Sequence, residues 1–147
     1  MTQTRIASAE EIGRVLPSHY HADGRRELFR FINREGLQVY ISRIAPGVTT
    51  AWHCHRLQTD TWAVTEGRLL VGLAASLDAP DPPRAEQVWL YDPHSTLVIP
   101  PGTWHGYHNP GPGFATLLNI TDSIYDPDDE LRADPHVIPG FWRVEDK

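Results

Sequence analysis

Two histidine-containing stretches constrain this chain more strongly than any other feature of its sequence. The first spans residues 47–67 with the spacing G-x5-H-x-H-x4-D-x6-G, and the second spans residues 100–109 with the spacing P-x-G-x2-H-x3-N. Successive side chains of a β-strand point to opposite faces, so His53 and His55 are predicted to face one common space while Cys54 faces away. Because the chain contains eight histidines, a single H-x-H pair can arise by chance and is weak evidence for a site. The stronger evidence is that the two stretches occur together.

The spacing of the two stretches predicts a metal site. Asp60 follows a short reversal after the first two histidines, and His105 follows a Pro-Pro-Gly turn that determines where its strand begins. Three imidazoles and a carboxylate that converge inside a barrel suit a divalent first-row metal ion with open coordination positions. We therefore expect a zinc, iron, manganese or nickel ion bound by His53, His55, Asp60 and His105. Because Asp60 is one methylene shorter than a glutamate, a water molecule or a fourth histidine would replace it if it does not reach the ion.

The composition is that of a single soluble domain. The chain has 147 residues, of which 40% are hydrophobic and 22% charged, and its formal net charge is -6. Such a chain can bury a substantial core. Its acidic balance without a basic cluster argues against a nucleic-acid partner, and no apolar run approaches the length of a membrane span. Residues 1–5 lack the apolar core of a signal peptide and the single cysteine excludes an internal disulfide, so we expect a cytoplasmic protein.

Turn-forming residues and short alternating runs predict a protein built mainly of β-strands. The chain contains 13 prolines and 11 glycines, which favours turns and short strands over helices. Residues 37–41 alternate apolar and polar side chains, as in a half-buried strand. Further strands are predicted at residues 27–33, 61–64, 68–74, 87–91, 96–99 and 114–120. Together these strands favour an antiparallel double sheet or barrel.

The two ends of the chain are predicted to be less regular. Ser8 and Glu11 fit a capping box, which predicts a short N-terminal helix of about two turns. The pair His19 and His21 is flanked by turn residues and is predicted to lie in a surface loop. The tail, residues 121–147, is predicted to be irregular and to pack across the barrel or onto a partner subunit through its aromatic side chains Tyr125, Phe141 and Trp142.

The paired histidine motifs resemble the signature of the cupin superfamily. That family usually has Glu where this chain has Asp60, and its second motif usually opens with Gly where His94 stands. The resemblance implies an all-β fold, namely a single-domain cupin jelly-roll barrel with the short N-terminal helix added to it. The domain would cover residues 1–147, with motifs at 47–67 and 94–109 and the tail at 121–147.

The chain also resembles the cupin branch related to deoxythymidine-diphosphate-4-dehydrorhamnose 3,5-epimerase. The matching stretches lie at residues 52–60, 98–107, 125–130, 134–135 and 138–139. This resemblance implies a homodimer and a small-molecule carbonyl substrate held inside the barrel. It also implies that His53 is the catalytic base, with Asp134 as a candidate for the acidic partner of that base.

The chain departs from that epimerase branch at the site itself. The epimerases carry a basic residue where Asp60 stands and Arg-Gly where Ala51-Trp52 stands, and their general-acid tyrosine falls near Asn119. Losing basic residues weakens the case for a diphosphate ligand, because a diphosphate is bound by Arg or Lys. Gaining His55 and Asp60 strengthens the case for a metal ion.

The chemistry predicted for such a site is proton transfer next to a carbonyl group. A metal ion beside a carbonyl makes the adjacent carbon acidic, and a nearby histidine can take the proton. The resulting enolate serves epimerisation or isomerisation of a keto-sugar, or the lyase-type cyclisation of a polyketide intermediate. The expected catalytic residues are His53, His105, Tyr107 and Tyr125. If the metal occupies His53, one of the two tyrosines or a metal-bound water would move the proton instead.

Two other functions are open from the sequence. A cupin dioxygenase uses the same ligands with a redox-active metal, and such a barrel can also bind a ligand without catalysis. Two side chains are open as well: Trp62 could line the pocket or pack in the core, and Tyr125 could belong to a lid or anchor the tail. Trp52 and Trp104 each precede a motif histidine and are predicted to point away from the site.

Overall fold

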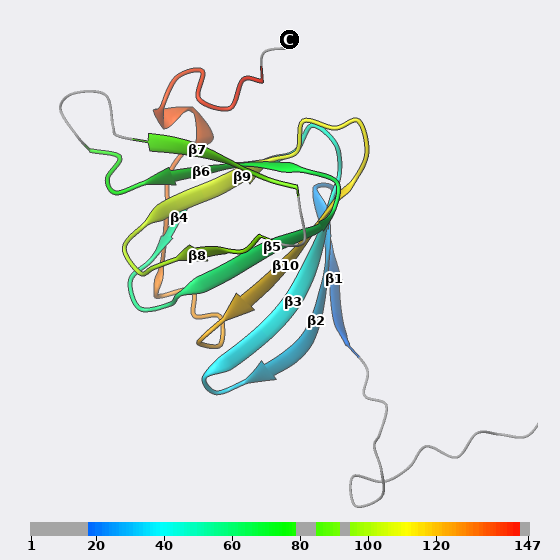
Figure 1. Ribbon diagram of the computed structural model, residues 1–147. Coiled ribbons are helices and arrows are strands. Elements are labelled where there is room, and N and C mark those ends of the chain that lie inside the picture. Colours follow the sequence, from blue (N-terminus) through cyan, green and yellow to red (C-terminus); the bar gives the residue numbers. More distant parts are fainter. Residues whose placement is uncertain (1–17, 79–84, 92–94, 145–147) are drawn as a thin grey trace, which may run out of the picture.

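Two antiparallel β-sheets pack face to face in this protein (Figure 1). The computed structural model describes residues 18–78, 85–91 and 95–144. One sheet has six strands in the order β1 (His19–Ala22), β2 (Arg26–Arg34), β3 (Leu37–Ile44), β10 (Ala115–Thr121), β5 (Asp60–Glu66) and β8 (Leu97–Ile99). The other has five strands in the order β11 (Glu130–Arg132), β4 (Thr49–His55), β9 (Trp104–His108), β6 (Leu69–Ala74) and β7 (Ala85–Leu90). The described residues also form one short 3-10 helix, η1 (Pro135–Val137), and none of their helices has the length and hydropathy of a membrane span.

This arrangement is a jelly-roll barrel, which confirms the predicted all-β fold class. The loop predicted at His19 and His21 is wrong, because these residues form β1, which pairs along the edge of β2, but their predicted exposure at the surface is confirmed. The tail is not wholly irregular either, since it contributes β11, which pairs with β4. The helix predicted from residues 8–11 and the motif position His94 lie outside the described residues.

The interior of the sandwich changes from apolar to polar along its strands. The inward residues of β10 run from Ala115 and Leu117 to Asn119 and Thr121, and all four are buried. The first two lie in the apolar core, together with Ile44, Val64, Leu69, Val71, Leu90 and Ile99. The last two pair with positions that carry polar atoms or an indole ring, namely Gln38, Tyr40, Asp60 and Trp62. Burial of the apolar end holds the two sheets together, and the polar end is the part of the interior that can support chemistry.

Strand β3, the neighbour of β10, also presents polar side chains to the interior. Its buried positions include the polar residues Gln38 and Ser42, whereas Val39 and Ile41 are only half-buried on the outer face. The β3–β10 register places Tyr40 opposite Asn119 on the inward face. The half-buried strand predicted here therefore exists with its polar face inward, because that face borders the polar end of the interior.

The C-terminal aromatic residues pack on the outer side of the five-stranded sheet. The rings of Phe141 and Trp142 each lie 5.0 Å from the ring of Trp52. A Cβ atom added at Gly72 would lie 2.6–2.7 Å from all three rings, so only glycine lets the tail approach this closely. The tail thus packs across its own barrel, and Trp52 points away from the interior as predicted.

Candidate metal centre and active site

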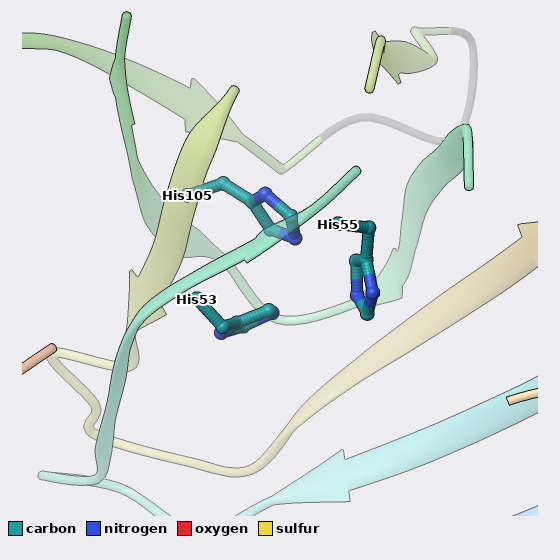
Figure 2. A group of neighbouring side chains, drawn as sticks. All are labelled: His53, His55 and His105. Carbon is teal, nitrogen blue, oxygen red and sulfur yellow. The ribbon is translucent and has the colours of Figure 1, made fainter. Parts of the chain in front are cut away.

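Three histidines meet on the inner face of the five-stranded sheet. His53 and His55 are two residues apart on β4, and His105 on the neighbouring strand β9 lies directly opposite His53. One ring nitrogen from each histidine lies within 4.8 Å of the other two. Figure 2 shows the three rings pointing into one common space. The structure therefore brings together the three imidazoles that the motif spacing predicted to converge.

The hydrogen bonding of His105 fits this residue for metal binding. Its Nδ1 lies 2.9 Å from the carbonyl oxygen of Thr103. Because a carbonyl only accepts hydrogen bonds, Nδ1 carries the proton and donates, which leaves the lone pair of the neutral ring on Nε2. That Nε2 atom is buried and has no hydrogen-bond partner in the protein. An imidazole oriented by a backbone carbonyl through its other nitrogen is the usual arrangement of a metal-bound histidine.

Asp60 lies at the edge of the histidine cluster rather than within it. It begins β5 in the opposite sheet, and its Oδ2 is 3.6 Å from Nε2 of His105. Its Oδ1 accepts a hydrogen bond from Nε2 of Gln58. Burial raises the pKa of Asp60, but the proximity of His105 and the hydrogen bond from Gln58 outweigh this effect, so the net pKa lies below its usual value. Asp60 therefore presents a carboxylate beside the cluster, and its coordination to a metal stays a prediction.

His53 is held in its neutral form. Burial is the main cause that lowers its pKa well below the usual value, and the neighbouring His105 and His55 lower it further. A neutral imidazole is the form that binds metal ions and also the form that can accept a proton. The electrostatics of His53 thus suit both of the roles predicted for it.

A cavity of about 640 Å³ opens beside the histidines, between the two sheets. His53, His55 and Asp60 line it together with Trp62. The ring of Trp62 is 1% exposed and lies 5.3 Å from the ring of His105. Trp62 therefore satisfies both predictions made for it, since it packs in the core and also borders the site. Cys54 is buried, and it is absent from the cavity lining as predicted.

Both predicted catalytic tyrosines border this cavity. The ring of Tyr107 is buried in the core, and its hydroxyl accepts a hydrogen bond from Nη1 of Arg26 at 3.3 Å. Tyr125 is 44% exposed at the mouth of the cavity, and its hydroxyl donates to Glu130 at 2.7 Å. Glu130 belongs to the tail strand β11, so this hydrogen bond ties Tyr125 to that strand.

A third tyrosine was not identified from the sequence. Tyr40 lines the cavity from the six-stranded sheet, and its hydroxyl accepts a hydrogen bond from Nδ2 of Asn119 at 2.5 Å. Burial, followed by the charge of Asp60, raises the pKa of Tyr40 well above its usual value. The only sequence signal was its place in the alternating run of β3, which does not say which face turns inward.

Four arginines also line the cavity, although the sequence motifs contain no basic cluster. They are Arg25, Arg26, Arg30 and Arg132. Three of them come from β2 or the turn before it, and the fourth comes from β11. The basic residues that are missing at the motif positions are therefore offset by arginines from distant segments of the chain.

Asp134, the candidate for the acidic partner of His53, lies in the tail at the start of η1. It is the N-cap of η1, and its Oδ1 accepts a hydrogen bond from the backbone N–H of His136 at 2.7 Å. Asp134 is not among the residues that line the cavity. Its observed role is to begin this turn of the tail.

Comparisons with known proteins identify relatives of the chain. No family model matches it. The chain is 33% identical over 111 residues to the spore coat polysaccharide biosynthesis protein SpsL of Bacillus subtilis, a match that covers 71% of this chain and 73% of SpsL.

Solved structures share the fold. The capsular polysaccharide assembling protein CapF of Staphylococcus aureus is similar with a TM-score of 0.71 and 18% identity, over 86% of this chain and 36% of CapF. An oxalate oxidase is similar with a TM-score of 0.52 and 31% identity, over 60% of this chain and 42% of that protein. The chain thus spans little more than a third of the length of CapF. Its jelly-roll barrel, its paired histidine motifs and its similarity to SpsL together show that the chain belongs to the SpsL family of cupins, in the branch that resembles dTDP-4-dehydrorhamnose 3,5-epimerase.

Proposed function

We propose that this cupin is a sugar-modifying enzyme of polysaccharide biosynthesis that moves a proton next to a carbonyl group. The observation that carries the proposal is the convergence of His53, His55 and His105 beside a cavity that the first two histidines line together with three tyrosines. The similarity to SpsL and to CapF, both named for polysaccharide production, supports a sugar-type substrate. Epimerisation or isomerisation is the reaction type that this combination favours.

The three histidines are the residues that would hold a divalent metal ion, with Asp60 as a further candidate. When bound, the ion would polarise the carbonyl oxygen of the substrate and stabilise the negative charge of an enolate. His105 is prepared for this role by its hydrogen bond to Thr103, and His53 by its lowered pKa. If His53 is instead free of metal, it is the base that removes the proton.

The two walls of the cavity can act on opposite faces of a substrate. His53 projects from the five-stranded sheet, whereas Tyr40 projects from the six-stranded sheet. Epimerisation requires that a proton leave one face of a carbon and return to the other. The raised pKa of Tyr40 keeps its proton in place until an acceptor as basic as an enolate forms beside it. Tyr107 and Tyr125 are alternative proton carriers, from the core and from the rim.

Oxidation with molecular oxygen is the second candidate function. The sequence and fold similarity to an oxalate oxidase favours it, and three histidines also suit a redox-active metal. The two functions differ in whether oxygen is consumed, so one set of measurements separates them.

Proton exchange tests the proposal directly. Keto-sugars, and poly-β-keto compounds as the test for cyclisation, are incubated with the enzyme in deuterated water. The expected result is that deuterium enters the carbon beside the carbonyl faster than in buffer, that exchange is lost when metal is stripped, and that it returns when metal is restored. Oxygen consumption in proportion to turnover would reject the proposal in favour of the oxidase. Exchange that survives complete metal removal would assign the reaction to a metal-free His53 base.

A further inference from the structure

The four arginines of the cavity fall into two kinds. Arg25 is paired with Asp23 at 3.1 Å, and Arg132 is paired with Glu130 at 2.9 Å. Arg26 and Arg30, by contrast, have no carboxylate within ion-pair distance among residues 18–78, 85–91 and 95–144. The Nε atoms of both are buried and have no hydrogen-bond partner in the protein. Both arginines are half-buried, and within the described part of the chain neither has an ion-pair partner, although the charge of Asp23 acts on Arg26 from a greater distance.

These two arginines point into the space between the sheets. In the β2–β3 register, Arg26 lies opposite Ile44, which is fully buried, and Arg30 lies opposite Tyr40, which lines the cavity. Arg26 reaches across to the other sheet, where its Nη1 donates to the hydroxyl of Tyr107 at 3.3 Å. Arg26 also lines the same cavity as His53. Arg26 therefore lies next to the proposed reaction centre.

An uncompensated cation in such a place costs stability. Removing a charged group from water is unfavourable unless an opposite charge or several hydrogen bonds replace the lost hydration. A bound anion would supply both. The planar guanidinium group also matches the two oxygens of a carboxylate in a bidentate arrangement.

We propose that Arg26 and Arg30 form an anion subsite inside the barrel and that the carbonyl substrate carries a carboxylate, which this subsite holds close to the reacting carbon. The substrate class is therefore an acidic carbonyl compound such as a sugar acid or keto acid. The identification of this ligand as the substrate rests on the proposed function, whereas the subsite itself does not. A phosphate group shares the chemistry of a carboxylate at two arginines, and the experiment distinguishes the two.

Direct binding measurements test the subsite without any need for turnover. Malonate and inorganic phosphate are titrated separately into the purified protein by isothermal titration calorimetry. We expect saturable binding of malonate to the unaltered protein, tighter than that of phosphate. Arg26→Gln and Arg30→Gln should each weaken malonate binding about tenfold or more, because each removes a charge-assisted pair. Arg34→Gln, which removes the same charge from an exposed position at the end of β2, should change it less than about twofold.

A second set of variants guards against loss of the fold and against binding elsewhere. Arg26→Lys keeps the charge without the planar fork, and it should bind malonate with intermediate affinity while its circular dichroism matches the unaltered protein. Tighter binding of phosphate than of malonate would overturn the carboxylate assignment and indicate a phosphate ester. Equal affinity in all variants, no saturable binding, or binding lost only in His53→Ala would overturn the subsite. Failed deuterium exchange with intact malonate binding would reject the proposed function and leave the subsite standing.

Discussion

His53 and His105 lie directly opposite each other in the β4–β9 pairing, and their ring centroids are 4.2 Å apart. Because the two strands are anchored by their own hydrogen bonds and core, removing either ring should leave the barrel folded. We predict that His53→Ala and His105→Ala each abolish metal retention, whereas Cys54→Ser retains metal, because that side chain is absent from the cavity lining. Elemental analysis with circular dichroism measures both properties. Normal metal content in His53→Ala would refute the proposed ligand set.

Gly106 allows strands β4 and β9 to approach each other at the site. A Cβ atom there would contact the Cβ of Ala51 and would lie 2.7 Å from the backbone oxygen of Thr50. Since backbone cannot easily move aside, we predict that Gly106→Ala lowers the free energy of unfolding by about 1–3 kcal/mol and also weakens metal retention. Gly113→Ala is the matched control, because nothing lies within 4 Å of its added Cβ. Urea unfolding of the two variants should separate them clearly, and equal midpoints would contradict the prediction.

The aromatic contact between the tail and Trp52 should stabilise the protein. Phe141 and Trp142 are both partly buried against that ring. We predict that Phe141→Ala lowers the free energy of unfolding by about 2–3 kcal/mol, since it removes a ring from a packed cluster. Leu57→Ala, at a position that is 81% exposed, should change stability by less than about 0.5 kcal/mol. Thermal unfolding of the two variants provides the comparison, and a neutral Phe141→Ala would mean that the tail is not packed this way in solution.

A variant of Tyr40 should separate the two steps of the proposed reaction, namely removal of the proton and its return to the opposite face. Tyr40→Phe leaves the histidine wall intact, so deuterium exchange from that face should persist. Return of the proton to the opposite face should be slowed by about tenfold or more, which is at the low end of the usual contribution of a general acid. Measuring exchange and product formation on the same sample tests this. A variant that forms product at the normal rate would assign the proton donor to Tyr107 or Tyr125.

The raised pKa of Tyr40 also has a consequence for stability at high pH. The folded state holds this proton more tightly than the unfolded chain, in which a tyrosine titrates near 10. Its contribution to stability is therefore complete below about pH 10 and is lost as the pH rises toward the folded pKa. We predict that unfolding between pH 9 and pH 11 shows a smaller loss of stability in Tyr40→Phe than in the unaltered protein. An equal loss in both would show that Tyr40 ionises normally in the fold.

The histidine cluster and the orientation of its flanking residues could be predicted because they depend on local geometry. Two residues separated by one along a strand share a face whatever the rest of the fold does, which is why His53 and His55 converge and Trp52 turns outward. The turn before His105 similarly sets the start of its strand. By the same alternation Cys54 could be predicted to lie outside the site.

The face of β3 that turns inward could not be predicted in this way. Alternation alone identifies two faces, and the usual assumption places the apolar one inside. Here Tyr40 and Ser42 face the interior because the neighbouring strand presents Asn119 there. The edge strand at His19 and His21 could not be predicted either, because it depends on pairing with β2 and its own residues have no apolar alternation.

The chain by itself determined the all-β pattern, the turns and the shared face of His53 and His55, because strand periodicity and turn chemistry act over a few residues. The pairing of β4 with β9 adds His105 to them. Only the tertiary structure decided what those imidazoles face. Strand β2 brings Arg26 to the hydroxyl of Tyr107, more than eighty positions away along the chain, and the tail strand β11 brings Arg132 opposite His53. Such pairings follow from how two sheets stack and which edges meet, and these depend on burial summed over the whole molecule rather than on any local run of residues.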